Sequence, residues 1–135
     1  MTDATPPTNV QVNPTFTFTG RFRSVRFALQ GIRTMLASQH NAWMHAGSTA
    51  AVIVAAFAFR VDRLEWCMLI LAMMAVWTAE ALNTAFEFLC DVASPDFHPM
   101  VARSKDVAAG AVLLSAIGSV AMGLLVFGPH VLRLL

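Results

Sequence analysis

Residues 107–128 read VAAGAVLLSAIGSVAMGLLVFG and carry no charged side chain. A helix needs about 20 mainly apolar residues to cross the hydrocarbon core of a membrane, and this stretch is long enough. Its small residues, alanine and glycine, allow the close helix–helix approach that is typical of membrane proteins. The stretch therefore predicts a membrane-spanning helix, and with it an all-α membrane protein.

Two further apolar stretches precede this one along the chain. Residues 42–59 contain no Asp, Glu, Lys or Arg, and residues 64–90 form a longer, mainly apolar run. Residues 60–63 are so short a connection that the two helices must form an antiparallel hairpin. The composition agrees, because 57% of the 135 residues are hydrophobic and 13% are charged, against about 25% charged in a typical soluble domain. We therefore expect three transmembrane helices, at about 42–59, 64–90 and 107–128.

The N-terminal part of the chain divides into a polar tail and a basic segment. Residues 1–19 are rich in Thr, Pro and Asn, and we expect a disordered tail rather than a secretory signal peptide. In residues 20–40, four arginines alternate with apolar side chains that recur at helical spacing. Such a basic amphipathic helix is typical of the membrane surface, and a helix packed on its own protein is the alternative. Residues 20–135 are then a single membrane domain.

The distribution of Lys and Arg predicts the orientation in the membrane. Six of these residues lie before the first span or in the connection at 91–106, and three lie on the other side. Cytoplasmic segments carry the excess of positive charge, so we expect the N-terminus and residues 91–106 in the cytoplasm. The formal net charge of +1 predicts no nucleic-acid partner.

A stripe of polar side chains interrupts the second apolar stretch. Glu80 is followed by Asn83, Glu87 and Asp91 at offsets of 3, 7 and 11 residues. At about 3.6 residues per turn, all four fall within about 80° of one another on one helix face. Ionisable groups in a membrane are costly, so the stripe needs basic side chains, protons or a divalent cation as partners. One carboxylate can also act as a base, whereas the alternative is a structural role in hydrogen bonding between helices.

The third span is preceded by Lys105, the only lysine of the chain, and by Asp106. The ammonium group either anchors the helix at the interface or binds phosphate as a point charge. Asp106 fits the N-cap or the first turn of the helix, where an acid stabilises the terminus. At the start of the first span, His45 fits a hydrogen-bonded packing residue.

The sequence EALNTAFE at residues 80–87 resembles the E-x-x-N-T-A-x-E signature of prokaryotic diacylglycerol kinases and undecaprenol kinases. The resemblance covers about residues 21–130, and its ordered motifs are far more specific than a single pattern. The other matching segments are Phe27–Ala28, Gly31–Ile32, Asn41, His45, Glu65–Trp66, Asp91, Pro95, His98–Pro99 and residues 105–112.

The resemblance implies a small integral-membrane kinase that moves the γ-phosphate of ATP onto a lipid alcohol, either undecaprenol or diacylglycerol. Family members have three spanning helices and an amphipathic surface helix, assembled as a homotrimer in the bacterial inner membrane. The implied chemistry is phosphoryl transfer by positioning, Mg2+ and a base, without a P-loop. The matching site residues are Glu80 as general base, Asn83 to orient the reacting groups, Glu87 as Mg2+ ligand, Lys105 and Asp106 as the phosphate-binding pair, and Arg23 near the nucleotide.

One position departs from the family pattern. The family commonly has a second metal-binding glutamate eight residues after Gly31, where this chain has Gln39. An amide oxygen can still bind a hard cation, but it brings no charge. We therefore expect Gln39 to be a weak metal ligand.

A function of another class is also compatible with the carboxylates. Glu80 and Glu87 could line a cation or proton conduit, or belong to a non-catalytic membrane assembly. Lys105, Asp106 and the basic helix at 20–40 favour the kinase, because an enzyme that handles phosphate needs positive charge and a cation conduit does not.

Overall fold

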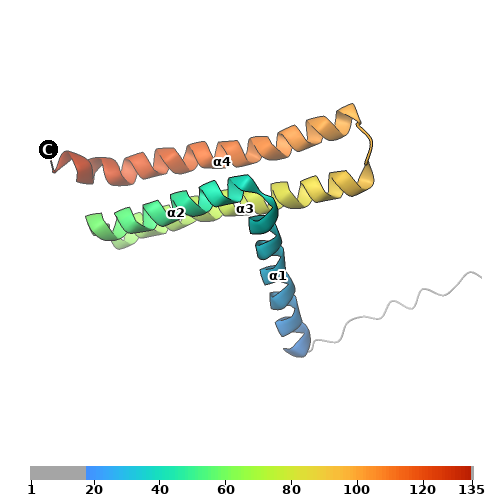
Figure 1. Ribbon diagram of the computed structural model, residues 1–135. Coiled ribbons are helices and arrows are strands. Elements are labelled where there is room, and N and C mark those ends of the chain that lie inside the picture. The colour runs from blue at the N-terminus through green and yellow to red at the C-terminus, as the bar shows by residue number, and fades with distance from the viewer. Residues whose placement is uncertain (1–17, 135) are drawn as a thin grey trace, which may run out of the picture.

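The computed structural model describes residues 18–134, and the side chains from Arg21 onward. Four helices follow one another along the chain: α1 (Phe18–Ser38), α2 (His40–Phe59), α3 (Arg63–Ala93) and α4 (Pro99–Leu132). Figure 1 shows α2, α3 and α4 side by side, whereas α1 leaves this bundle at a steep angle. The protein is all-α, as predicted, and the three bundled helices are each long and apolar enough to cross a membrane.

The turn between α2 and α3 is formed by a left-handed residue at the end of α2 and a capping box at the start of α3. Arg60 adopts the left-handed conformation, with φ 52° and ψ 48°, and its N–H bonds back to carbonyl oxygens in the last turn of α2. Asp62 then caps α3: its side chain accepts from the N–H of Glu65, and the Glu65 side chain accepts from the N–H of Asp62. This capping box satisfies two backbone donors that the helix start would otherwise leave unpaired.

Helices α3 and α4 form the most extensive contact of any helix pair in residues 18–134. Ser119 of α4 donates a hydrogen bond of 3.0 Å to the carbonyl oxygen of Ala72 in α3. Near the α2–α3 turn, Nε2 of His130 lies 3.0 Å from Oε1 of Glu65. The buried apolar cluster also lies at this end, so packing and polar contacts together fix the three helices there. Its members are Ala56, Val61, Leu69 and Val126.

The helix boundaries differ from the predicted ones, most of all in α4. Residues 99–106 were expected in a connection, but α4 begins at Pro99, with His98 as N-cap accepting from the N–H of Met100. Proline fits the first helical position because it has no N–H to satisfy. Asp106 is therefore well inside α4, and the prediction that it caps the helix was wrong.

Helix α1 begins at Phe18 and ends at Ser38, close to the predicted surface helix at 20–40. The predicted tail at 1–19 lies, apart from its last two residues, outside the residues that the structure describes. The apolar side chains Phe22, Val25, Leu29 and Ile32 are exposed along α1. The contact of this helix with a membrane surface stays a prediction.

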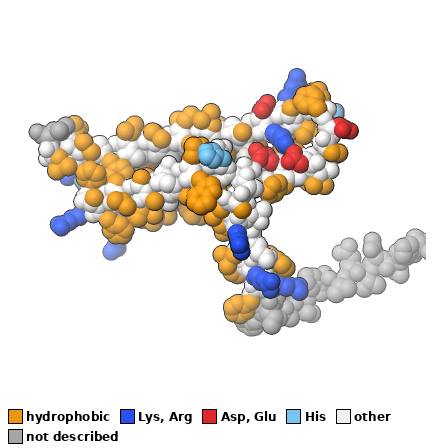
Figure 2. Space-filling model, viewed as in Figure 1, with side chains coloured by type: hydrophobic (Ala, Val, Ile, Leu, Met, Phe, Trp, Pro, Cys, Tyr) orange, Lys and Arg blue, Asp and Glu red, His pale blue; other side chains and the backbone are white. Residues whose placement is uncertain are grey.

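Charged and apolar side chains are segregated along the bundle. Figure 2 shows apolar side chains covering its middle, with Lys, Arg, Asp and Glu gathered on α1 and at the two ends of the bundle. Most large apolar side chains of α2 and α4 are exposed in the single chain. An apolar band between two charged ends is what a hydrocarbon environment requires.

Candidate active site

The polar stripe of α3 is buried at Glu80 and Asn83, half-buried at Glu87 and exposed at Asp91. Glu80, Asn83 and Thr84 are the buried polar residues among those that the structure describes, and Glu80 is 0% exposed. The hydroxyl of Thr84 donates to the carbonyl oxygen of Glu80 at 2.9 Å, so it is satisfied by its own helix. Glu80 and Asn83 are thus the two side chains that bring polar chemistry into the protein interior.

The carboxylate of Glu80 has unused hydrogen-bonding capacity. Neither of its oxygens has a hydrogen-bond partner in residues 21–134, and Oδ1 of Asn83 is also unpartnered there. Nε2 of His45, on α2, lies 3.8 Å from Oε2 of Glu80. Because a buried polar atom without a partner costs free energy, this group of acceptors is suited to a ligand that donates a proton.

Glu87 lies one turn beyond Asn83 and is half-buried. Nε2 of Gln39 donates a hydrogen bond of 2.7 Å to Oε2 of Glu87, and Nδ2 of Asn83 donates a longer one of 3.4 Å to Oε1. Gln39 is the extended residue between α1 and α2, where it occupies the N-cap position of α2. The bend between the first two helices therefore carries Gln39 to Glu87, 48 residues away in the sequence.

Lys105 forms an ion pair across the α3–α4 connection. Its Nζ lies 2.6 Å from Oδ1 of Asp91, the last member of the stripe. Asp106 is exposed beside it on α4. Asp91 was predicted only as the last member of the stripe, and the short connection between α3 and α4 is the signal that could have paired it with Lys105.

Arg23 is not part of this group of residues. It is exposed on α1, 16 residues before Gln39, which corresponds to about 24 Å along a helix. Within residues 21–134, no ion pair joins Arg23 to a carboxylate of α3. The structure of one chain thus brings together Glu80, Asn83, Glu87 and Gln39, with Lys105 nearby, and leaves Arg23 apart.

The side chains of Glu87 and Gln39 suit a Mg2+ ion that a nucleotide binds as well. No group of three or more His, Cys, Asp or Glu side chains in the described part of the chain could hold a metal ion alone. Mg2+ commonly takes one or two carboxylates and completes its ligands with water and substrate phosphates. The carboxylate of Glu87 and the amide of Gln39 supply oxygen donors of this kind, so they fit a cation shared with a nucleotide.

The polar stripe of α3 runs past the level at which α2 begins. Helix α2 has 20 residues, about 30 Å, which matches the hydrocarbon thickness, and it starts level with Glu87 through the Gln39 contact. Glu80 then lies about 10 Å deeper along α3, and Asp91 lies about 6 Å beyond Glu87 on the opposite side. Glu80 thus lies within the length of the three long apolar helices, and Lys105, paired with Asp91, lies toward their end.

Comparison with known proteins gives consistent matches over this region. The family model described as prokaryotic diacylglycerol kinase matches residues 26–127, which include every proposed site residue except Arg23. The undecaprenol kinase of Bacillus subtilis is 34% identical over 108 residues, covering 80% of this chain and 88% of that protein. The diacylglycerol kinase of Synechocystis sp. is 35% identical over 113 residues, covering 83% of this chain and 65% of that protein. The diacylglycerol kinase of Escherichia coli (strain K12) is 25% identical over 118 residues, covering 87% and 97%.

Proposed function

The chain belongs to the prokaryotic diacylglycerol kinase family and is a lipid kinase; from that premise we propose that Glu80 is the general base that activates a membrane lipid hydroxyl. The observation that carries this proposal is the burial of the Glu80 carboxylate with neither oxygen hydrogen-bonded in the described residues. Both oxygens of such a carboxylate remain available to accept the proton of a hydroxyl.

The reaction follows from this placement. The lipid hydroxyl gives its proton to Glu80, and its oxygen forms a bond to the γ-phosphorus of ATP. The bond between that phosphorus and the β,γ-bridging oxygen breaks, so the products are a lipid phosphate and ADP. Asn83 is one turn from Glu80 on the same face, and its unpartnered Oδ1 can orient the hydroxyl or the nucleotide.

The remaining site residues bind the nucleotide in this proposal. Lys105, with Asp106 beside it, places an ammonium at the water-facing end of the stripe, where the phosphates arrive. Glu87 holds Mg2+ with Gln39 as a weaker ligand, and Mg2+ when bound neutralises negative charge on the phosphates. Arg23 keeps its proposed place near the nucleotide only through the family resemblance, because in the single chain it is exposed on α1, apart from the other site residues.

We further propose that the protein works as a homotrimer in the bacterial inner membrane. The single chain encloses only a small polar interior, and a polar site in lipid must be screened by protein. The excess of Lys and Arg puts the N-terminus and the α3–α4 connection in the cytoplasm, where ATP is available. In this arrangement residues 20–135 form one domain, with α1 as its amphipathic surface helix and residues 1–19 as a tail.

The acceptor lipid is either undecaprenol or diacylglycerol, and a transfer assay distinguishes them. Purified protein in mixed micelles receives γ-labelled ATP, Mg2+ and one of the two lipids. We expect label on at least one lipid, and the Glu87→Gln variant to need more Mg2+ for the same rate. The matched control is Asp96→Asn, which removes an exposed carboxylate from the α3–α4 connection. If folded protein that binds ATP labels neither lipid, the proposal fails.

A further inference from the structure

His45 is the side chain that α2 presents to the buried carboxylate of α3. Its Nε2 lies 3.8 Å from Oε2 of Glu80, and both side chains are largely shielded from solvent. In the part of the chain that the structure describes, no hydrogen bond reaches either oxygen of Glu80. His45 is therefore positioned to supply the donor that this carboxylate lacks.

The other donor side chains around the stripe are hydrogen-bonded to groups other than the carboxylate of Glu80. The amide groups of Gln39 and Asn83 both donate to Glu87, and the ammonium of Lys105 pairs with Asp91. The hydroxyl of Thr84 donates to the backbone. Of the donor-bearing side chains around the stripe, this leaves the imidazole of His45 for Glu80.

The imidazole is held in place by its neighbours. The ring of His45 lies edge-on to the indole of Trp77, with 6.4 Å between centroids and 68° between planes. Nε1 of Trp77 in turn donates a 3.1 Å hydrogen bond to Thr49, one helical turn after His45 on α2. These contacts fix the imidazole relative to α3, so its direction toward Glu80 is set by packing.

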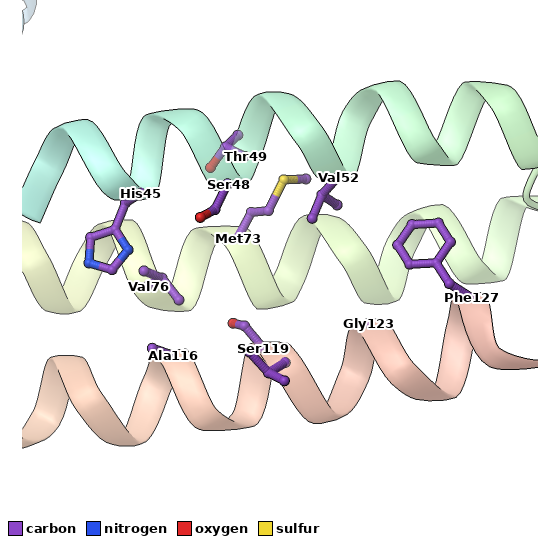
Figure 3. A pocket seen from close by; sticks show the side chains of 11 residues that line it. His45, Ser48, Thr49, Val52, Met73, Val76, Ala116, Ser119, Gly123 and Phe127 are labelled. Carbon is purple, nitrogen blue, oxygen red and sulfur yellow. The ribbon is translucent and has the colours of Figure 1, made fainter.

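His45 also borders a cavity that Glu80 does not line. The cavity, of about 230 Å3, lies between α2, α3 and α4, and most of its walls are apolar. In Figure 3 His45 lies at one end of it, with Ser48 and Thr49 nearby and Phe127 at the far end. His45 thus contacts Glu80 and also forms part of the wall of this mainly apolar cavity.

We propose that His45 is a positioning residue for the reaction, whose Nε2–H donates to Oε2 of Glu80 and so orients the carboxylate. This inference rests on the proposed role of Glu80 as base. With Oε2 held by His45, Oε1 remains to accept the proton of the lipid hydroxyl. The contact of 3.8 Å is longer than a hydrogen bond of about 2.9 Å, and hydrogen bonds of this kind often tighten only when substrate is bound.

Two amide substitutions separate this role from simple packing. The side-chain nitrogen of glutamine can occupy the place of Nε2, whereas that of asparagine reaches only the place of Nδ1. We expect His45→Gln to keep kcat within about threefold of the original protein, and His45→Asn to lower kcat by about tenfold or more with the KM for ATP unchanged. The matched control is His98→Asn, because asparagine is a good N-cap and preserves the start of α4.

The full-length protein in mixed micelles is used throughout, with γ-labelled ATP, Mg2+ and whichever lipid the original protein phosphorylates. Thermal unfolding and ATP binding of each variant are measured alongside the rates. Retained kcat in the glutamine variant with lost kcat in the asparagine variant supports the proposal. Equal rates in the two variants, whether both high or both low, overturn it, as does a failure of both to fold, since His45 would then be purely structural. If the original protein itself labels no lipid, the failure is that of the proposed function.

Discussion

Replacing Gln39 by glutamate tests whether residue 39 belongs to the proposed Mg2+ site, where this chain has Glu87 as its one carboxylate. In the present structure Gln39 donates a 2.7 Å hydrogen bond to Glu87, and a hydrogen bond to a charged group is worth about 1.5–3 kcal/mol. Glutamate cannot donate, and two like charges about 4 Å apart repel by about 4 kcal/mol at an effective dielectric constant of about 20. Since both side chains are only half-buried and can turn apart, we expect Gln39→Glu to destabilise the metal-free protein by about 2–4 kcal/mol.

Mg2+ should reverse this loss, because a divalent cation between two carboxylates turns their repulsion into joint binding. The assay is thermal unfolding in micelles across a Mg2+ titration, with turnover followed in parallel. We expect Tm of the variant to fall without Mg2+ and to recover as Mg2+ is added, with half-saturation at about tenfold lower Mg2+ than in the original protein. Gln30→Glu, on an exposed part of α1, is the matched control. Identical Mg2+ titrations for Gln39→Glu and the original protein would refute the placement of residue 39 at the metal site.

Three further substitutions probe other parts of the account. Glu80→Gln should lower kcat by about 100-fold or more, because a general base contributes about 10²–10⁴, while ATP binding measured by titration stays the same; unchanged turnover would remove Glu80 from the role of base. Lys105→Met should raise the KM for ATP by about tenfold with a smaller change in kcat, because the ATP phosphates lose their contact with the ammonium group. An unchanged KM would mean that the ion pair of Lys105 with Asp91 is purely structural. Asp62→Ala should cost about 1 kcal/mol of stability, because it removes the capping box with Glu65. The expected result is a lower Tm with kcat preserved. A loss of kcat at equal Tm would contradict a purely structural role of Asp62.

The apolar helices were predictable from the sequence because a helix that crosses hydrocarbon needs about 20 mainly apolar residues. Residues 107–128 have no charge over the length that a membrane requires, and they lie inside α4. The start of α4 was missed because the charges at 103–106 are typical of a connection. The stronger local signal was the pair His98–Pro99, an N-cap followed by a proline at the first helical position.

The candidate site was predictable where it depends on one helix and not where it depends on two. The offsets within residues 80–91 place Glu80, Asn83 and Glu87 on one face, because helical periodicity alone determines this. The hydrogen bond between Gln39 and Glu87 depends on the angle at which α1 meets α2, and the approach of His45 to Glu80 depends on how α2 packs on α3. Neither relation follows from the spacing of residues within a single helix.

The proposed chemical step is the transfer of a proton from a lipid alcohol to a buried carboxylate on α3 during phosphoryl transfer from ATP. It is tested most directly by a single-turnover measurement of labelled lipid phosphate, with the protein in excess over γ-labelled ATP and with undecaprenol or diacylglycerol in the micelle. We expect the original protein to convert the bound label into lipid phosphate, and Glu80→Gln to bind the same amount of ATP while forming the product at least about 100-fold more slowly. Equal rates in the two proteins, or no lipid phosphate from a folded protein loaded with ATP and Mg2+, would contradict the account.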